Sequence, residues 1–350
     1  MKINRILIVA ALLLLVGGIG VAKLIKAHRE QALPEKEQVM QVGDYRIVGP
    51  YVHENLAVFL VQGEDKIKGR NFLTLQEALE QQKVVVHETS DVNELTIENV
   101  SEDEVYIQSG DIVKGGKQDR VLAYDLILSP KSGQLPLAAY CVERGRWRSR
   151  GQESATKFDS ANEHLSSKEL KLAAKRSKQQ GEVWEQVAEA QKKLTKNLGV
   201  SVESDKSATS LPLTLENEKL QQATEDYIKA LSTIIDGKAD VIGFAFAING
   251  KINNTDIYAS SALFRKLWPK LLKASAVEAI AELQTGKQNP VVTVDDLKSC
   301  LADVEKGTKT EQSVAGRTKV ISQETEKNIS FETRDQSKGD TWVHRNYIRK

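Results

Sequence analysis

The segment Asp240–Tyr258, DVIGFAFAINGKINNTDIY, carries the clearest hairpin signal in the chain. Two runs suited to β-strands flank Asn249-Gly250, and this dipeptide supplies the two positive-φ positions of a type I′ turn. The segment therefore predicts two antiparallel strands. We expect a helix after them, from about Ala262 to Leu283, in which Pro269 marks a kink or a restart.

Short apolar runs also dominate residues 42–147. They are separated by turn residues such as SPKSG at 129–133, and no long helical pattern connects them, which is typical of antiparallel sheets and sandwiches. One short helix is expected among them, because Thr74 and Glu77 have the spacing of a capping box. The expected strands are residues 45–48, 56–61, 84–86, 95–97, 105–107, 121–128 and 135–142.

The middle of the chain is hydrophilic and predicts helices, because its apolar residues recur every three or four positions. The expected helices are residues 168–178, 182–198 and 220–234. Gly199 and Gly237 are placed to end the second and third of them. Residues 148–167 have little apolar content, so we expect a surface connection there. The last expected elements are a helix at 295–304 and strands at 318–321, 329–333 and 342–348.

These patterns predict an α+β protein. An N-terminal antiparallel β-rich sheet or sandwich would be followed by a helical section and a C-terminal hairpin-helix-strand section. We expect residues 42–147 to form the β-rich part and residues 148–350 the helical and α+β part, packed together as one large domain. A chain of 350 residues that is 40% hydrophobic can bury such a core. Its formal net charge of +1 gives no whole-chain reason to expect a nucleic-acid partner.

Residues 1–30 differ from the rest of the chain. Positions 6–22 carry no charged side chain and have basic residues on both sides, as in an export signal. Small residues near the end of the run fit a cleavage site, whereas residues 6–25 approach the roughly 20 residues that an uncleaved membrane anchor needs. Both alternatives stay open. We expect an exported protein of the cell envelope or periplasm, either anchored in the membrane or secreted after signal cleavage.

The first candidate site is the loop Gly115-Gly116-Lys117-Gln118-Asp119-Arg120, between two expected strands. Paired glycines let backbone N–H groups approach an anion closely, and Lys117 and Arg120 add positive charge. The alternative is a β-turn in which the glycines adopt positive φ and the charged groups stay in water.

The second candidate site is Glu143-Arg144-Gly145-Arg146-Trp147, at the end of the last expected strand of the β-rich part. Arg146 could bind a phosphate, Trp147 could stack on a ring, and Glu143 is a candidate catalytic base. The alternative is structural, with a Glu143–Arg146 ion pair fixing the chain and an arginine covering the indole. His53 is a further candidate acid or base, because its ordinary pKa lies near neutrality.

The sequence gives no sign of a metal or cofactor site. The five histidines show neither HExxH nor zinc-finger spacing. No GxGxxG follows an expected strand and no GxSxG is present. Cys141 and Cys300 are too few for a disulfide scaffold, and one bridge and no bridge both stay open.

Several short motifs follow one another in a distinctive order: Gly49-Pro50-Tyr51, Thr74-Leu75, Gly115-Gly116-Lys117-Gln118, Arg120-Val121, Cys141-Val142-Glu143 and Gly145-Arg146-Trp147. This order resembles the ARG and rhodanese-phosphatase-superfamily-associated protein domain family, most closely over residues 42–147. The family name records association with ADP-ribosylglycohydrolases and with rhodanese or phosphatase proteins. The resemblance implies that the glycine loop and the segment ending at Trp147 occupy the family's signature positions.

We therefore expect an exported or membrane-anchored protein that binds or processes an anionic ligand, such as a phosphate or an ADP-ribose-like molecule. The expected ligand-binding residues are Gly115, Gly116, Lys117, Gln118, Arg120, Arg146 and Trp147. The alternative is a non-catalytic envelope module that binds another protein and in which both motifs are structural staples, that is, internal ion pairs that hold the fold. We expect no cofactor, no metal and no nucleic acid.

Overall fold

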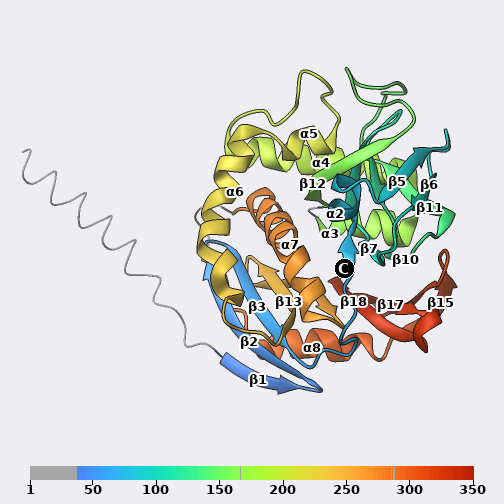
Figure 1. Ribbon diagram of the computed structural model, residues 1–350. Coiled ribbons are helices and arrows are strands. Elements are labelled where there is room, and N and C mark those ends of the chain that lie inside the picture. Colours follow the sequence, from blue (N-terminus) through green and yellow to red (C-terminus); the bar gives the residue numbers. More distant parts are fainter. Residues whose placement is uncertain (1–37, 166, 285, 287) are drawn as a thin grey trace, which may run out of the picture. The chain divides into compact units, whose positions relative to one another are not determined.

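The computed structural model describes residues 38–350 except 166, 285 and 287. Their largest element is an antiparallel nine-stranded sheet, which occupies the lower part of Figure 1. Its strands in spatial order are β1 (Gln38–Val42), β2 (Tyr45–His53), β3 (Leu56–Gln62), β13 (Val241–Ile248), β14 (Lys251–Tyr258), β18 (Thr341–Arg349), β17 (Asn328–Asp335), β16 (Thr318–Glu324) and β15 (Thr308–Ser313).

The predicted hairpin is confirmed as β13 and β14, and it lies in the middle of this sheet. Asn249 and Gly250 have φ values of 51° and 73°, as a type I′ turn requires. Every residue of β13 is buried, because the strand has a neighbour on each edge and helices on both faces. The hairpin therefore forms the centre of the structure.

The β-rich N-terminal segment is divided between sheets. Its first strands, β2 and β3, join the hairpin and the C-terminal strands in the nine-stranded sheet. A six-stranded sheet contains β12 (Phe158–His164), β8 (Asp111–Gly115), β9 (Arg120–Leu122), β11 (Gly133–Cys141), β6 (Glu94–Asn99) and β5 (Val84–Glu88). A three-stranded sheet contains β10 (Leu126–Leu128), β7 (Val105–Ile107) and β4 (Leu73–Thr74). The α+β class is confirmed.

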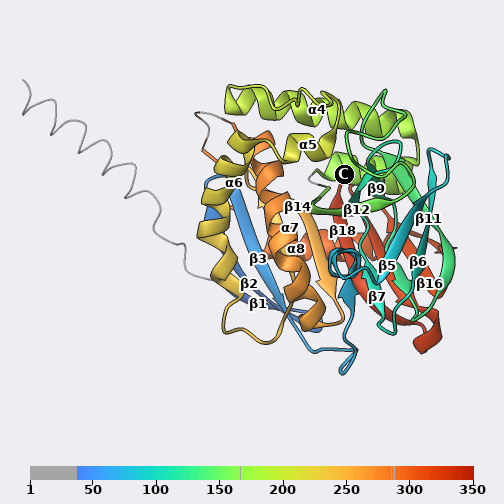
Figure 2. The ribbon, with the colours of Figure 1, turned by 45° about the horizontal axis from the view of Figure 1, so that its top comes forward.

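Helices cover both faces of the nine-stranded sheet (Figures 1 and 2). Phe244 and Phe246 of β13 pack against α7 (Ser261–Ala281) and α6 (Glu218–Leu231) in one core. The alternate residues Ala245 and Ala247 pack in the core that contains α8 (Val294–Val304), because successive strand residues point to opposite faces. The other helical segments are α2 (Leu75–Glu80), α3 (Lys168–Leu172), the π-helix η1 (Ala173–Ser177), α4 (Gln180–Leu198), α5 (Leu211–Leu215) and the short 3₁₀ helices η2 (Ser232–Ile235) and η3 (Gln336–Lys338).

Two local predictions are wrong. The strand expected at 121–128 is two strands, β9 and β10, since residues 123–125 leave the sheet between them. The surface connection expected at 148–167 contains β12, which pairs with β8. Only a few residues of β12, such as Phe158 and Ala161, are buried and apolar, so its sequence lacks the alternation that marks a strand.

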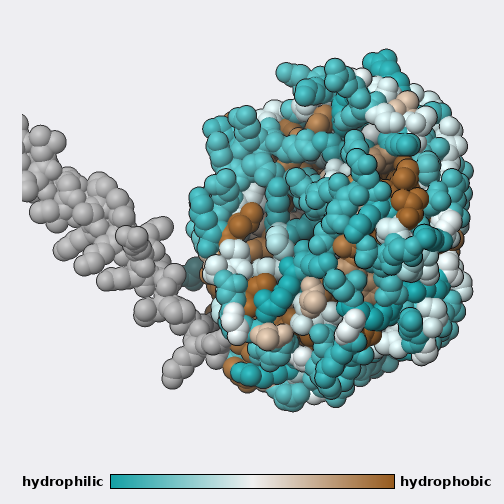
Figure 3. Space-filling model, viewed as in Figure 1, coloured by the Kyte–Doolittle hydropathy of each residue, from teal (hydrophilic) through white to brown (hydrophobic). Residues whose placement is uncertain are grey.

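Two other local signals are confirmed: Thr74 and Glu77 form the capping box of α2, and Gly199 ends α4 in the left-handed conformation. The helix does not restart at Pro269, because α7 runs through this residue as one helix. Residues Gln38–Lys350 form one compact unit. On the face in Figure 3, hydrophilic residues dominate and hydrophobic residues form separate small patches.

The predicted export segment at residues 6–25 lies outside the described residues. Within the part of the chain that the structure describes, no helix has the length and apolar character needed to cross a bilayer.

Candidate functional site

The two candidate motifs lie side by side. Strand β9 starts at Arg120, just after the glycine loop, and pairs with the end of β11, where Arg120 and Cys141 are register partners. The antiparallel pairing thus places residues before β9 beside residues after β11. Gln118 Nε2 donates a hydrogen bond to the Glu143 carbonyl oxygen at 2.8 Å, and the Asp119 N–H donates to the Glu143 carboxylate at 3.4 Å.

Gly115 and Gly116 lie where the backbone packs too closely against its neighbours to leave room for a side chain. Gly115 and Gly116 have φ values of 121° and 54°, and a Cβ on Gly116 would lie 2.3 Å from the Phe158 ring. The Gly115 N–H donates to the Asp119 carboxylate, and the Gly116 N–H donates to the carbonyl oxygen of Ser154. Both N–H groups are therefore used inside the protein, as expected for a structural turn.

Arg120 also points inward. Its side chain is fully buried, lies 3.6 Å from Glu88 and donates to the Gln118 carbonyl oxygen. Lys117 is partly exposed, and its Nζ lies 5.0 Å from the centre of the Trp147 ring. The Arg120 guanidinium lies 5.9 Å from the same ring. Trp147 therefore covers the basic end of the glycine loop.

Four charged side chains form an internal ion-pair cluster around these motifs. Asp119 and Glu143 are both fully buried. Arg146 Nε lies 2.6 Å from Glu143, and its Nη2 lies 3.3 Å from Asp119. Arg150 Nη1 lies 3.0 Å from Asp119 and 3.6 Å from Glu143. Burial disfavours the charge of Arg150, but Asp119 and the nearby Glu153 outweigh it and raise the pKa of Arg150.

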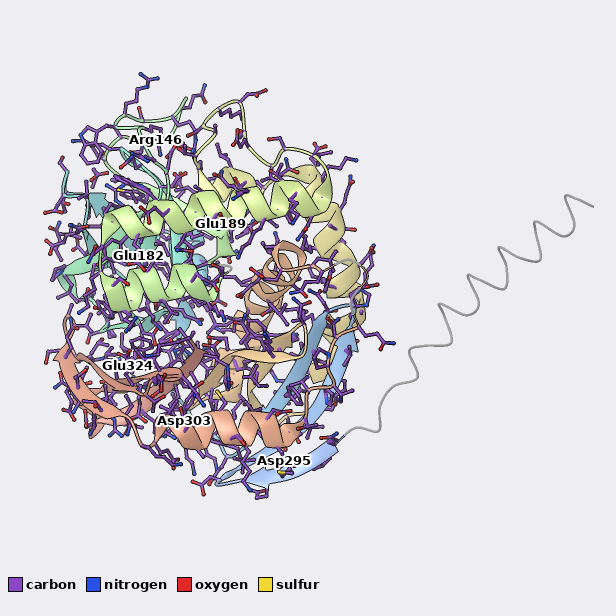
Figure 4. The ribbon with its side chains drawn as sticks, turned by 180° about the vertical axis from the view of Figure 1, so that it is seen from behind. Arg146, Glu182, Glu189, Asp295, Asp303 and Glu324 are labelled. Atoms are coloured by element: carbon purple, nitrogen blue, oxygen red, sulfur yellow. The ribbon has the colours of Figure 1, made fainter. Side chains whose placement is uncertain are left out.

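A cavity of about 740 Å³ adjoins this cluster. One part of its wall is the segment Arg144–Gly151 and the other is Lys206–Thr209, and we call it the arginine pocket. Figure 4 shows Arg146 among the loops beyond α4, far from Asp295 and Asp303 of α8. Trp147 is 45% exposed at this pocket.

The positive charges of the pocket differ in how they are neutralised. Arg146 and Arg150 are paired with buried carboxylates. Within the described part of the chain, Arg144, Arg148 and Lys206 form no ion pair, and all three are exposed. Arg144 instead lies 5.8 Å from the centre of the Trp184 ring. The exposed wall of the pocket therefore carries an excess of positive charge.

The structure thus brings the predicted residues close together, but only some of them line the pocket. Of the predicted residues, only Arg146 and Trp147 line the pocket. The pocket wall also contains Arg144, which lies in the second candidate segment but was not an expected ligand-binding residue, and Arg148, Arg150 and Lys206, which the prediction missed. A signal for the first three is visible in RGRWRSR, where an arginine stands at every second position from 144 to 150. Lys206 has no such signal, because only the fold brings it to this wall.

The two candidate acid–base residues lie in different surroundings. Glu143 is held by two arginines and is not part of the pocket wall. His53 lies at a separate hollow of about 530 Å³, with its ring 4.9 Å from Tyr227 in an edge-on arrangement. The two cavities share no lining residue.

Neither a disulfide nor a metal-binding cluster is found among the described residues. Cys141 and Cys300 are buried and unbridged, and burial raises the pKa of each thiol to about 11. No group of three or more His, Cys, Asp or Glu side chains in residues 38–350, leaving out 166, 285 and 287, has a metal-binding arrangement.

Comparison with known protein families finds a match over most of the chain. The family model of the ARG and Rhodanese-Phosphatase-superfamily-associated Protein domain matches residues 44–348. No curated protein and no solved structure matches the chain significantly. Because the match extends from the turn before β2 into β18, it includes both motifs and the arginine pocket. The chain belongs to the ARG and Rhodanese-Phosphatase-superfamily-associated Protein domain family.

Proposed function

We propose that this protein binds a small anionic ligand, of the phosphate or ADP-ribose-like class, in the arginine pocket. The observation that carries the proposal is the position of Arg144, Arg148 and Lys206, which face the pocket without a carboxylate partner among the described residues. An anion would supply the acceptors that these groups lack.

The internal ion pairs give the pocket a fixed wall. Arg146 and Arg150 are held by Asp119 and Glu143, so the segment between them is anchored at both ends. Arg148, between the two anchors, is then presented on a stiff segment, which reduces the entropy lost on binding. Trp147 offers an exposed indole beside it for a planar or sugar ring.

Binding is favoured over processing. A general base has to reach the proton that it removes, and Glu143 is instead occupied by Arg146 and Arg150. The pocket volume is within the range of about 300–1,000 Å³ that is common for small-molecule sites. Residues 6–25 support our proposal that the module is exported or membrane-anchored.

Isothermal titration of the protein with inorganic phosphate and with ADP-ribose tests this function. The variant Arg148→Ala/Lys206→Ala removes two unpaired charges from the pocket, and we expect it to weaken binding by about tenfold or more. The control Lys298→Ala/Lys309→Ala removes the same charge from α8 and β15 and should bind like the wild type. No heat with either ligand at millimolar concentration, or unchanged affinity in the first variant, would contradict the proposal.

The second candidate is a protein-interaction module in which the motifs are structural staples. The burial of Asp119, Glu143 and Arg120 in internal ion pairs favours it. One pair of measurements distinguishes these two proposed functions. Loss of thermal stability in Glu143→Ala together with no heat of ligand binding would support the interaction module, whereas binding lost in Arg148→Ala/Lys206→Ala at wild-type stability would support the ligand site.

A further inference from the structure

The two walls of the arginine pocket are joined by a buried hydrogen bond. Both walls, Arg144–Gly151 and Lys206–Thr209, are loops outside the helices and the strands of the sheets, so their separation depends on contacts between them. Ser210, the residue after the second wall, donates its hydroxyl hydrogen to the Asp119 carboxylate at 3.1 Å. Asp119 and Ser210 are both fully buried, which strengthens this bond relative to one in water.

Asp119 also holds the first wall. Its Oδ1 accepts a hydrogen bond from Arg146 Nη2 at 3.3 Å, and its Oδ2 accepts one from Arg150 Nη1 at 3.0 Å. The same Oδ2 accepts the hydroxyl hydrogen of Ser210. Arg146 and Arg150 belong to the first wall, whereas Ser210 continues the second. A single carboxylate therefore connects the two walls.

Further contacts fix the second wall in place. Thr209 Oγ1 accepts a hydrogen bond from the Arg144 N–H at 3.1 Å and donates one to the Arg144 carbonyl oxygen at 2.8 Å. Gln191 of α4 donates to the Ala208 carbonyl oxygen at 2.7 Å. Ser210 is in addition the N-cap residue of α5. The second wall is thus tied to the first wall and to two helices, so the width of the pocket is defined by the fold.

The cations that lack a carboxylate partner in the described part of the chain lie on both walls. Arg144 and Arg148 belong to the first wall and Lys206 to the second. The pocket volume of about 740 Å³ is in the range of sites that hold drug-sized ligands, and one phosphate group fills only a small part of it. A ligand that reaches the cations of both walls therefore needs two linked anionic groups.

We propose that Asp119 and Ser210 are positioning residues that hold the two walls at the separation required by a diphosphate group, so that the pocket selects diphosphate compounds over single phosphates. This inference rests on the proposed anion-binding function of the pocket. One phosphate of the ligand contacts the wall that carries Arg148, and the other reaches Lys206. Neither Asp119 nor Ser210 lines the pocket, so both act through the walls rather than on the ligand.

Isothermal titration of the protein with inorganic phosphate and with inorganic pyrophosphate tests the inference. Pyrophosphate carries more charge than phosphate, so tighter binding alone does not show that it spans the two walls. Ser210→Ala removes the link between the walls and leaves every charge in place. We expect this variant to weaken pyrophosphate binding severalfold and phosphate binding much less, which lowers the ratio of the two affinities.

The matched control is Ser260→Ala. It removes another buried N-cap hydroxyl, that of α7, which accepts a backbone N–H at 3.3 Å, the same distance as at Ser210. Ser260 does not line the pocket, so both affinities should stay as in the wild type.

The outcomes separate this inference from the proposed function. No binding of either anion to the wild type would contradict anion binding itself. Equal affinities of the wild type for the two anions, or an unchanged affinity ratio in Ser210→Ala, would leave anion binding in place and overturn the positioning role. An equal loss of affinity for both anions in Ser210→Ala would also overturn it, because general structural damage affects both ligands alike.

Discussion

Gln118 Nε2 lies 2.8 Å from the carbonyl oxygen of Glu143, so a direct hydrogen bond joins two motifs that are 25 residues apart in the chain. The bond lies beneath the arginine pocket rather than in it. The signature residues of this protein thus divide into an internal framework and an exposed wall, and the two parts should respond differently to mutation.

Glu143→Ala should lower the stability of the protein strongly. Removing this carboxylate leaves Arg146 without its 2.6 Å partner in a buried setting, and breaking a buried ion pair costs about 3–5 kcal/mol. Thermal melts with circular dichroism measure the effect. The matched control is Glu102→Ala, which breaks an ion pair with Lys131 on the surface and should cost less than about 1 kcal/mol. Equal shifts in the two variants would contradict the framework role.

Gly116→Ala should destabilise the protein more than Gly145→Ala. Both glycines have positive φ, so an alanine at either position is strained by about 1–2 kcal/mol. Only at Gly116 does the added Cβ also meet the Phe158 ring, at 2.3 Å, and overpacking costs about 1–3 kcal/mol more. Urea unfolding of the two variants measures the difference. A larger loss in Gly145→Ala would show that the contact with Phe158 does not restrict position 116.

Stability should fall as the pH rises from about 4.5 to 7, in part because of Glu278. Burial in α7 raises the pKa of this carboxyl to about 7. Below its ordinary value of 4.5, both folded and unfolded chains hold the proton; between 4.5 and 7 only the folded chain does, so folding becomes less favourable by up to about 3 kcal/mol. Glu278→Gln mimics the protonated form, and urea unfolding at several pH values should show a smaller decrease in this variant.

His344 should also make the protein less stable as the pH rises, but at higher pH than Glu278. Its pKa is raised, because Asp125 and Asp256 outweigh the effect of burial, so its contribution is complete below its ordinary value and disappears as the pH rises through the folded value. In Glu278→Gln, the part of the decrease that comes from His344 should therefore begin above pH 6.5, whereas Glu163, whose pKa burial also raises, should contribute a decrease at lower pH. A decrease of wild-type size between pH 4.5 and 7 in Glu278→Gln would show that Glu278 does not titrate in this range.

Neither cysteine should react while the protein is folded. Both thiols are buried, and burial raises the pKa of each to about 11, so at pH 8 only about one thiol in a thousand would be the reactive thiolate. Ellman's reagent should detect no thiol in the native protein and two after unfolding without reductant. Detection of none after unfolding would reveal a disulfide between Cys141 and Cys300.

Local sequence signals determined several parts of this structure without help from the fold. The Asn249-Gly250 turn, the capping box at Thr74 and the end of α4 at Gly199 depend on conformational preferences of a few adjacent residues. The two motifs were also visible as polar segments at strand ends. These features are predictable because the interactions that fix them join residues close in sequence.

Tertiary structure alone decided how these pieces combine. It paired β3 with β13, brought Lys206 to the wall that contains Arg148, and placed His344 between Asp125 and Asp256. It also used Arg120 and Glu143 for internal pairing rather than at the pocket. Most of these arrangements join residues that are far apart in the chain and depend on which strands, helices and loops pack together, a property that no single stretch of sequence carries.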